Sequence, residues 1–168
     1  MTPFKANIDL RKHIVQLICV TVFLVTFPIS SFAQLTVSTT QNLSFGTFAS
    51  TGTGGTVVVS STGVGSATGN VVLMSNSVEH QAIFHLTYTG KNKNVTSINI
   101  PASVTLTRTG GLGTMHMVFS KPNPNPSFQI NANSSIDLSI GGTLTVGTIV
   151  ANPGGSYTGS FSLTFNYN

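Results

Sequence analysis

Large apolar side chains alternate with polar ones along much of this 168-residue chain. The alternation is longest near the C-terminus, where the odd-numbered residues of 157–167 are aromatic, aliphatic or glycine and the residues between them are polar. Shorter stretches with the same period lie at residues 84–88, 104–106, 115–119 and 144–146. Because successive side chains of a strand point to opposite faces, the pattern predicts β-strands with one face on a core and the other in water.

Glycine pairs and clusters separate the alternating segments, at residues 52–55, 63–65, 110–111, 141–142 and 154–155. Short strands with regularly spaced turn signals are typical of a β-sandwich or a barrel, and we favour the sandwich. Charged residues make up only 6% of the chain, whereas long helices usually draw on Glu, Lys and Arg. The sequence therefore predicts an all-β, antiparallel sandwich with short strands and glycine-rich turns.

Residues 34–168 contain no linker and no repeat of fixed period, so we expect them to form a single domain. Prolines and asparagines alternate at residues 122–126. Since proline cannot donate a hydrogen bond to a central strand ladder, this segment is predicted to be an exposed loop rather than a hinge between domains.

The first 33 residues have the features of a cleavable signal peptide. Basic residues precede an apolar run over residues 14–27, and small residues then precede a predicted cleavage site between Ala33 and Gln34. The alternative is a membrane anchor, but this run is shorter than the ~20 residues that a spanning helix needs. We therefore expect a protein that is exported to the periplasm, the cell surface or the medium, with no stable membrane span after cleavage.

Removal of this leader changes the charge of the protein. The whole chain carries a net charge of +4, but much of that excess lies in the leader. The basic residues that remain are Lys91, Lys93, Arg108 and Lys121, against the acidic Glu79 and Asp137. No nucleic-acid partner is predicted from so small a basic excess.

The only cysteine, Cys19, also lies in the leader, so the exported part has no disulfide to form. Its stability must come from burial and backbone pairing. Glu79 and Asp137 are its only carboxylates, and nothing in the sequence brings them together as an acid–base pair. We expect no enzyme activity and no cofactor.

The three remaining histidines match no familiar metal-ligand spacing, and no metal site is predicted. His85 and His116 lie on the polar parity of their expected strands, where solvated imidazoles are the simplest interpretation. A two-histidine surface site would require those two strands to be neighbours, which the sequence leaves open.

Several segments occur in an order and spacing that resemble a secreted bacterial family known as domain of unknown function 4402. These segments are Leu43–Phe48, Gly55–Ser60, Ala67–Gly69, Ile100–Thr107, Gly113–Met115, Gly142–Gly147, Gly155–Phe161 and Asn166–Asn168. The resemblance implies an immunoglobulin-like sandwich, distantly similar to fimbrial subunits and to pilin-like proteins of the spore-coat U type. Such pilins typically end with a penultimate tyrosine and carry a glycine twelve positions before it, and Tyr167 and Gly155 stand in these positions. Many such pilins also have a disulfide, which this chain cannot form because Cys19 is its only cysteine.

A sandwich that lacks one strand leaves an apolar groove, which an extended segment of another subunit can complete by β-strand addition. We expect the terminal strand to form one wall of such a groove, through Phe161, Leu163, Phe165 and Tyr167. The segment that begins with Leu35 and Val37 is a candidate donor. The alternative, that this segment is the first strand of its own domain, is the default for neighbouring strands.

Two functions follow as hypotheses. The first is a non-enzymatic structural or assembly subunit at the bacterial cell surface, whose partners are proteins: further copies of itself or an assembly machinery. The second is a stand-alone secreted adhesin or glycan-binding module, which would use loops rich in Asn, Ser and Thr, with Tyr88 as a stacking platform. The alternative for Tyr88 is a core position, because it lies on the apolar parity of its segment.

Overall fold

A computed structural model describes residues 34–168, and every regular element in that range is a β-strand. The predicted leader up to Ala33 lies outside the described residues, and its cleavage stays a prediction. No helix that could cross a membrane occurs in residues 34–168. The strands are β1 (Gln34–Gln41), β2 (Phe48–Val59), β3 (Gly65–Leu73), β4 (Ala82–Thr89), β5 (Lys93–Asn99), β6 (Ser103–Arg108), β7 (Thr114–Phe119), β8 (Phe128–Ile130), β9 (Ser134–Ile140), β10 (Gly142–Val146), β11 (Tyr157–Thr158) and β12 (Thr164–Tyr167).

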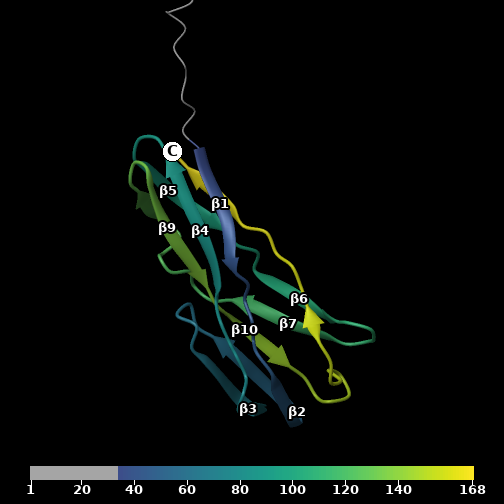
Figure 1. Cartoon of the computed structure of the whole chain (residues 1–168). Helices are drawn as coiled ribbons and strands as arrows, with labels where there is room; N and C mark the ends of the chain where they lie inside the picture. Colours follow the sequence, from purple (N-terminus) through teal and green to yellow (C-terminus); the bar gives the residue numbers. More distant parts are fainter. Residues whose placement is uncertain (1–33) are drawn as a thin grey trace, which may run out of the picture. The chain divides into compact units, whose positions relative to one another are not determined.

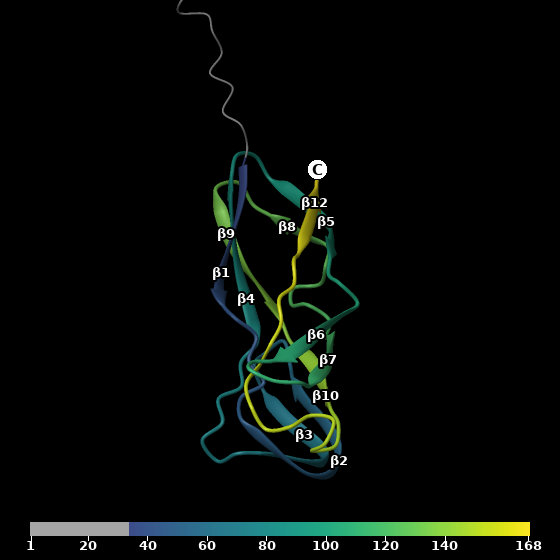
Figure 2. The ribbon, with the colours of Figure 1, turned by 90° about the vertical axis from the view of Figure 1, so that its right-hand side faces the viewer.

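These strands form three antiparallel sheets, with the orders β1-β4-β9, β12-β5-β8 and β11-β6-β7-β10-β2-β3 (Figure 1). The predicted all-β sandwich is confirmed. The chain changes sheet several times, so strands that follow one another in sequence often belong to different sheets. The C-terminal segment, for example, runs from β11 on the six-stranded sheet to β12 on a three-stranded one (Figure 2).

The two three-stranded sheets enclose one apolar core, and we call strands β1, β4, β9, β5, β8 and β12 the closed half. Leu86, Tyr88 and Leu138 come from the first sheet, and Val95 and Ile130 come from the second. All five are at most 2% exposed. These residues are buried because the side chains of one parity of each strand face the opposite sheet, as the alternation in the sequence indicates.

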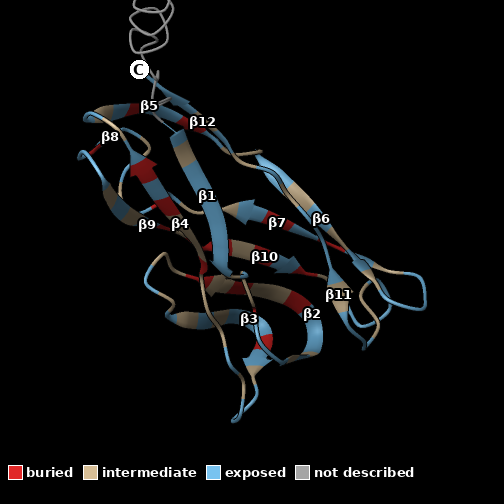
Figure 3. Cartoon of the chain, turned by 45° about the horizontal axis from the view of Figure 1, so that its top comes forward, coloured by how far each residue is buried: buried red, intermediate tan, exposed pale blue. Residues whose placement is uncertain are grey.

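The six-stranded sheet carries the second core, and we call its strands together with residues 42–47 the open half. The β2–β3 hairpin provides part of its cover, since its register breaks between Ser50 and Gly55 and both strands contain a glycine with positive φ, Gly54 and Gly69. Figure 3 shows β2 strongly curved. As a result Val57, near the end of β2, and residues near its start pack into the same core.

The proline–asparagine segment is held against the closed half rather than fully exposed. Pro122 is buried. Asn123 exchanges two backbone hydrogen bonds with Ser139 of β9, at 2.9 and 2.8 Å. The sequence pattern located the loop, but it did not reveal that the loop covers part of a sheet edge.

Candidate functional site: a groove between the two terminal segments

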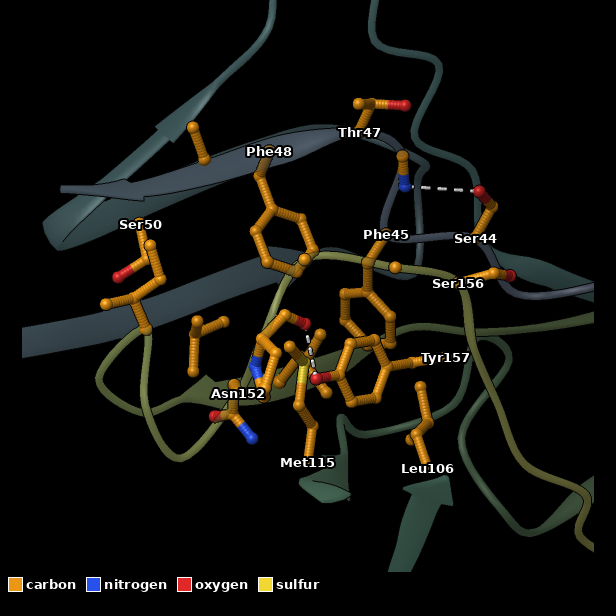
Figure 4. Close-up of a pocket in the computed structure, with 18 of the residues that line it drawn as sticks. Ser44, Phe45, Thr47, Phe48, Ser50, Leu106, Met115, Asn152, Ser156 and Tyr157 are labelled. Atoms are coloured by element: carbon orange, nitrogen blue, oxygen red, sulfur yellow. Dashed lines mark hydrogen bonds between the residues drawn. The ribbon is translucent and has the colours of Figure 1, made fainter. Parts of the chain in front are cut away.

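A groove crosses the inner face of the six-stranded sheet in the open half. It consists of two adjoining cavities of about 730 and 390 Å³. Both cavities are lined by Leu43, Phe45, Leu106 and Tyr157, so they form one continuous depression. Figure 4 shows the larger cavity, with the rings of Phe45, Phe48 and Tyr157 around it.

The first wall is residues 42–50, which comprise the connection between β1 and β2 and the first three residues of β2. It follows a bulge in β1 between Thr39 and Gln41. Ser44 exchanges backbone hydrogen bonds of 2.8 and 3.1 Å with His80, and the backbone N–H of Thr47 donates to the Ser77 hydroxyl at 2.7 Å. These contacts anchor the wall, and they leave Phe45 and Phe48 directed into the groove (Figure 4).

The second wall is residues 152–161, which lead into and past β11. The Tyr157 hydroxyl donates a 2.7 Å hydrogen bond to the Pro153 carbonyl and so fixes the turn that begins the wall (Figure 4). Gly159 allows the chain to run close to β6, because a Cβ at this position would lie 3.0 Å from both the Thr105 carbonyl oxygen and a methyl group of Val104. Residues 159–163 have no strand assignment, although they connect two paired strands.

The floor consists of apolar side chains from β6, β7 and β10. Met115, Met117, Leu144 and Val146 are buried, and Leu106 is half-buried. None of the residues that line either cavity is Asp, Glu, Lys, Arg or His. The groove therefore suits an uncharged, partly apolar ligand and offers no acid, base or metal ligand of its own.

The predicted wall residues at the C-terminus divide between two places. Phe161 lines the smaller cavity, and its ring packs edge-on against Phe119 at 4.6 Å and Phe84 at 6.1 Å between ring centroids. Leu163 and Phe165 instead pack on the core of the closed half. Tyr167 lies at the end of β12 opposite Val95 and is 46% exposed. The alternation predicted one strand through all four residues, but only Phe165 and Tyr167 lie in a strand, β12, because residues 159–163 cross between two sheets without a strand assignment. The pattern also could not tell which half each residue faces.

Gly155 lines the larger cavity. A Cβ at this position would lie 2.6 Å from Arg108 Nε, and its φ of +153° favours glycine. Arg108 Nε donates a 2.9 Å hydrogen bond to the neighbouring Gly154 carbonyl. The glycine therefore lets an arginine from β6 fasten the second wall.

The candidate donor segment is paired within its own domain. In β1, Leu35 lies opposite Tyr88 and Val37 lies opposite Leu86 of β4. The arrangement is the alternative that the sequence left open, with β1 as the first strand of its own domain. In this structure the N-terminal region contributes to the groove through Thr39 and the residues after β1.

Sequence reasoning missed the first wall. Leu43 and Phe45 have the spacing of a strand, but the nearby glycines and the polar residues between them hid their joint role with Phe48. In the second wall, residues 152–156 have no alternating pattern, and only Gly155 among them was indicated, by the resemblance to pilins. Only the fold brings these two segments to opposite sides of one sheet.

The ionisable residues lie outside the groove. Asp137 Oδ1 lies 2.6 Å from His85 Nδ1 across β4 and β9, on the exposed face of their sheet. Glu79 accepts a hydrogen bond from the Ser77 hydroxyl in the connection before β4. His85 and His116 belong to different sheets, so their strands are not neighbours.

Tyr88 is 1% exposed, and its hydroxyl has no hydrogen-bond partner among residues 34–168. It is a core residue, and it offers no stacking surface to a glycan.

A protein-family model described as a domain of unknown function, DUF4402, matches residues 35–167. The chain belongs to the DUF4402 family. Within residues 34–168 the match leaves out only Gln34 and Asn168, so the groove and both its walls are part of the DUF4402 domain. Comparisons with curated proteins and with solved structures give no significant match.

Proposed function

We propose that this DUF4402 protein is a secreted, non-enzymatic subunit of a bacterial surface assembly, and that its groove accepts an extended segment of a partner protein by β-strand addition. The observation that carries the proposal is the position of an unpaired backbone segment beside an apolar groove. Residues 159–163 follow a paired strand and precede another, yet they have no strand assignment. An added strand gains main-chain hydrogen bonds from such a segment and specificity from the side-chain pockets beside it.

The lining of the groove defines the segment that it would accept. Alternate side chains of an inserted strand would point to Leu106 and the buried methionines of the floor, so they would be apolar. The side chains between them would face water. A charged residue on the inward parity would lose its hydration without gaining a charged partner, because the lining contains no Asp, Glu, Lys, Arg or His.

Insertion would also complete the open half. Phe48, Leu106 and Tyr157 are only half-buried, although their rings and methyl groups face the core. Covering them removes apolar surface from water, at about 25 cal/mol per Å². The partner therefore stabilises the subunit, as expected for an assembly contact rather than for a transient encounter.

Hydrogen exchange on the exported protein tests the proposal. The chain is produced with its own first 33 residues, and mass spectrometry of the purified product reports whether cleavage follows Ala33. Surface assemblies are then compared with the dissociated subunit. We expect the amides of residues 159–163 to exchange much more slowly in the assembly, because they gain hydrogen bonds there. Unchanged exchange at these amides in a genuine assembly would contradict strand addition at this groove.

A matched pair of leucine variants tests whether the groove is the site of assembly. Leu106→Lys places a charge on the floor, whereas Leu112→Lys places the same charge on a side chain that is 91% exposed in the β6–β7 turn. We expect Leu106→Lys to abolish incorporation into surface assemblies and Leu112→Lys to retain it. Thermal unfolding of both variants shows whether Leu106→Lys is still folded. If a folded Leu106→Lys protein assembles normally, the groove is not the assembly site.

A further inference from the structure

Strand β1 presents a free sheet edge that is separate from the floor of the groove. It is the outer strand of the sheet β1-β4-β9, and within residues 34–168 it pairs only with β4. The side-chain hydrogen bonds recorded for its residues also lie on the β4 side: Thr40 Oγ1 to the Ile83 carbonyl and Gln41 Nε2 to the Gln81 carbonyl. The backbone groups on its other side are therefore available to a further strand.

The other sheet edges of the described chain have features that hinder pairing. Strands β8, β11 and β12 have only three, two and four residues. Strand β9 carries Asp137, and Asn123 covers part of it through the hydrogen bonds to Ser139. Strand β3 is bent at Gly69, where its pairing with β2 is irregular. Short, charged, covered or bent edges are the usual protection against pairing between molecules.

Strand β1 has none of these protective features along its first six residues. Residues 34–39 pair continuously with β4, and the eight-residue strand contains no charged residue, proline or glycine. Val37 lies on the core-facing parity, opposite the buried Leu86, and is still 38% exposed. An uncharged edge with an apolar residue left open at its centre is the kind of strand that recruits another strand.

We infer that the partner of this edge is β1 of a second copy of the chain, paired antiparallel about a twofold axis at Val37. In this register Val37 lies opposite Val37 of the second copy, Leu35 opposite its Thr39, and Thr36 opposite its Ser38. On the inner face Val37 then meets Val37 and Leu35 meets Thr39, and on the outer face the hydroxyl groups of Thr36 and Ser38 can hydrogen-bond to each other. The two sheets join into one six-stranded sheet across the dimer.

The charge distribution also fits a twofold contact. Like charges directly opposite each other would oppose pairing, but β1 has no ionisable side chain. The α-amino group that cleavage after Ala33 would leave on Gln34 lies opposite Thr40 of the second copy in this register, not opposite another charge. The nearest ionisable side chains of this sheet, His85 and Asp137, lie on β4 and β9, one and two strands away from the junction. The inference goes beyond strand addition at the groove, because β1 stays in its own domain and only its edge is used.

Sedimentation equilibrium of the exported protein over a wide range of concentrations tests the dimer. Val37→Lys is compared with Val118→Lys, because Val118 is a similarly exposed valine (46%) on β7 of the six-stranded sheet. Val37→Lys places two like charges opposite each other, and we expect it to raise the dimer dissociation constant by about tenfold or more. Val118→Lys should leave the constant unchanged. A wild-type protein that stays monomeric at every concentration, or a Val37→Lys dimer of unchanged affinity, would overturn the inference.

A cysteine at the axis tests the register without adding a charge. Directly opposed residues of an antiparallel pair have Cα atoms about 4.5–5.5 Å apart, which a disulfide can bridge. Val37→Cys should therefore form a covalent dimer on mild oxidation, while Val118→Cys stays reduced; the native Cys19 lies in the predicted leader. A dimer in which Val37→Cys does not cross-link would overturn the register. The Leu106→Lys protein should dimerise normally through β1. Failure of strand addition at the groove can therefore be distinguished from failure of the β1 dimer.

Discussion

The two halves of this DUF4402 domain have similar strands but differ in how their cores are covered. In the closed half, two sheets face each other, and residues such as Leu86 and Leu138 are 0% exposed. In the open half, one wide sheet is covered by the curved β2–β3 hairpin and by two irregular segments, with the groove between them. The closed half therefore has the more completely buried core, and the open half has the groove at which we propose that a partner binds.

Truncation of one leucine in each half should give the largest contrast. Leu86→Ala removes a side chain that is packed on all sides, and we expect it to lower the free energy of unfolding by about 2–5 kcal/mol. Leu106→Ala should lower it by about 1 kcal/mol, because Leu106 is only half-buried beside the groove and its loss leaves no closed cavity. Urea denaturation of both variants measures the contrast. Equal losses would show that the floor of the groove is as well packed as the closed core.

A substitution at the bend of the β2–β3 hairpin should destabilise the open half through the backbone rather than through the groove. A Cβ on Gly54 would lie 2.2 Å from the Val146 carbonyl oxygen, and the residue has a φ of +92°. We expect Gly54→Ala to lower the free energy of unfolding by about 1–3 kcal/mol, because both the contact and the backbone conformation disfavour a side chain. Gly110→Ala is the control, since Gly110 also has a positive φ (+74°) but a Cβ there would have no heavy atom within 4 Å. If both substitutions have equal effects, backbone conformation alone accounts for the loss and the close approach at the bend contributes nothing.

The sequence predicted the closed half better than the open half for a physical reason. Strands such as β4 and β9 lie between water and one core, so their alternation reports burial directly, and Leu86, Tyr88 and Leu138 could be assigned to a core from parity alone. The groove is different, because its walls are defined by segments without a period, such as residues 152–156. Their positions depend on tertiary contacts that a local pattern does not contain, including the hydrogen bond from Tyr157 to Pro153.

The terminal segments illustrate the same limit. Alternation predicted one terminal strand that carries Phe161, Leu163 and Phe165, but only Phe165 lies in a strand, β12. It could not show that this segment crosses from one sheet to another, so that Phe161 lies at the groove and the next two inward residues close the other core. Parity assigns a side chain to a face, but only the topology determines what covers that face.

Two tyrosine-to-phenylalanine substitutions should give the smallest and most specific contrast. Tyr157→Phe removes the hydroxyl that donates to the Pro153 carbonyl, and we expect it to lower the free energy of unfolding by about 0.5–1.5 kcal/mol. Tyr88→Phe should be neutral or stabilising, because the Tyr88 hydroxyl is buried without a partner and its removal relieves an unfavourable desolvation. Both substitutions delete a phenolic oxygen. If one lowers the urea midpoint and the other raises it, the difference must come from the environment of each hydroxyl. A clear loss of stability in Tyr88→Phe would mean that its hydroxyl has a partner in solution, and the closed half would then be less tightly sealed than its packing indicates.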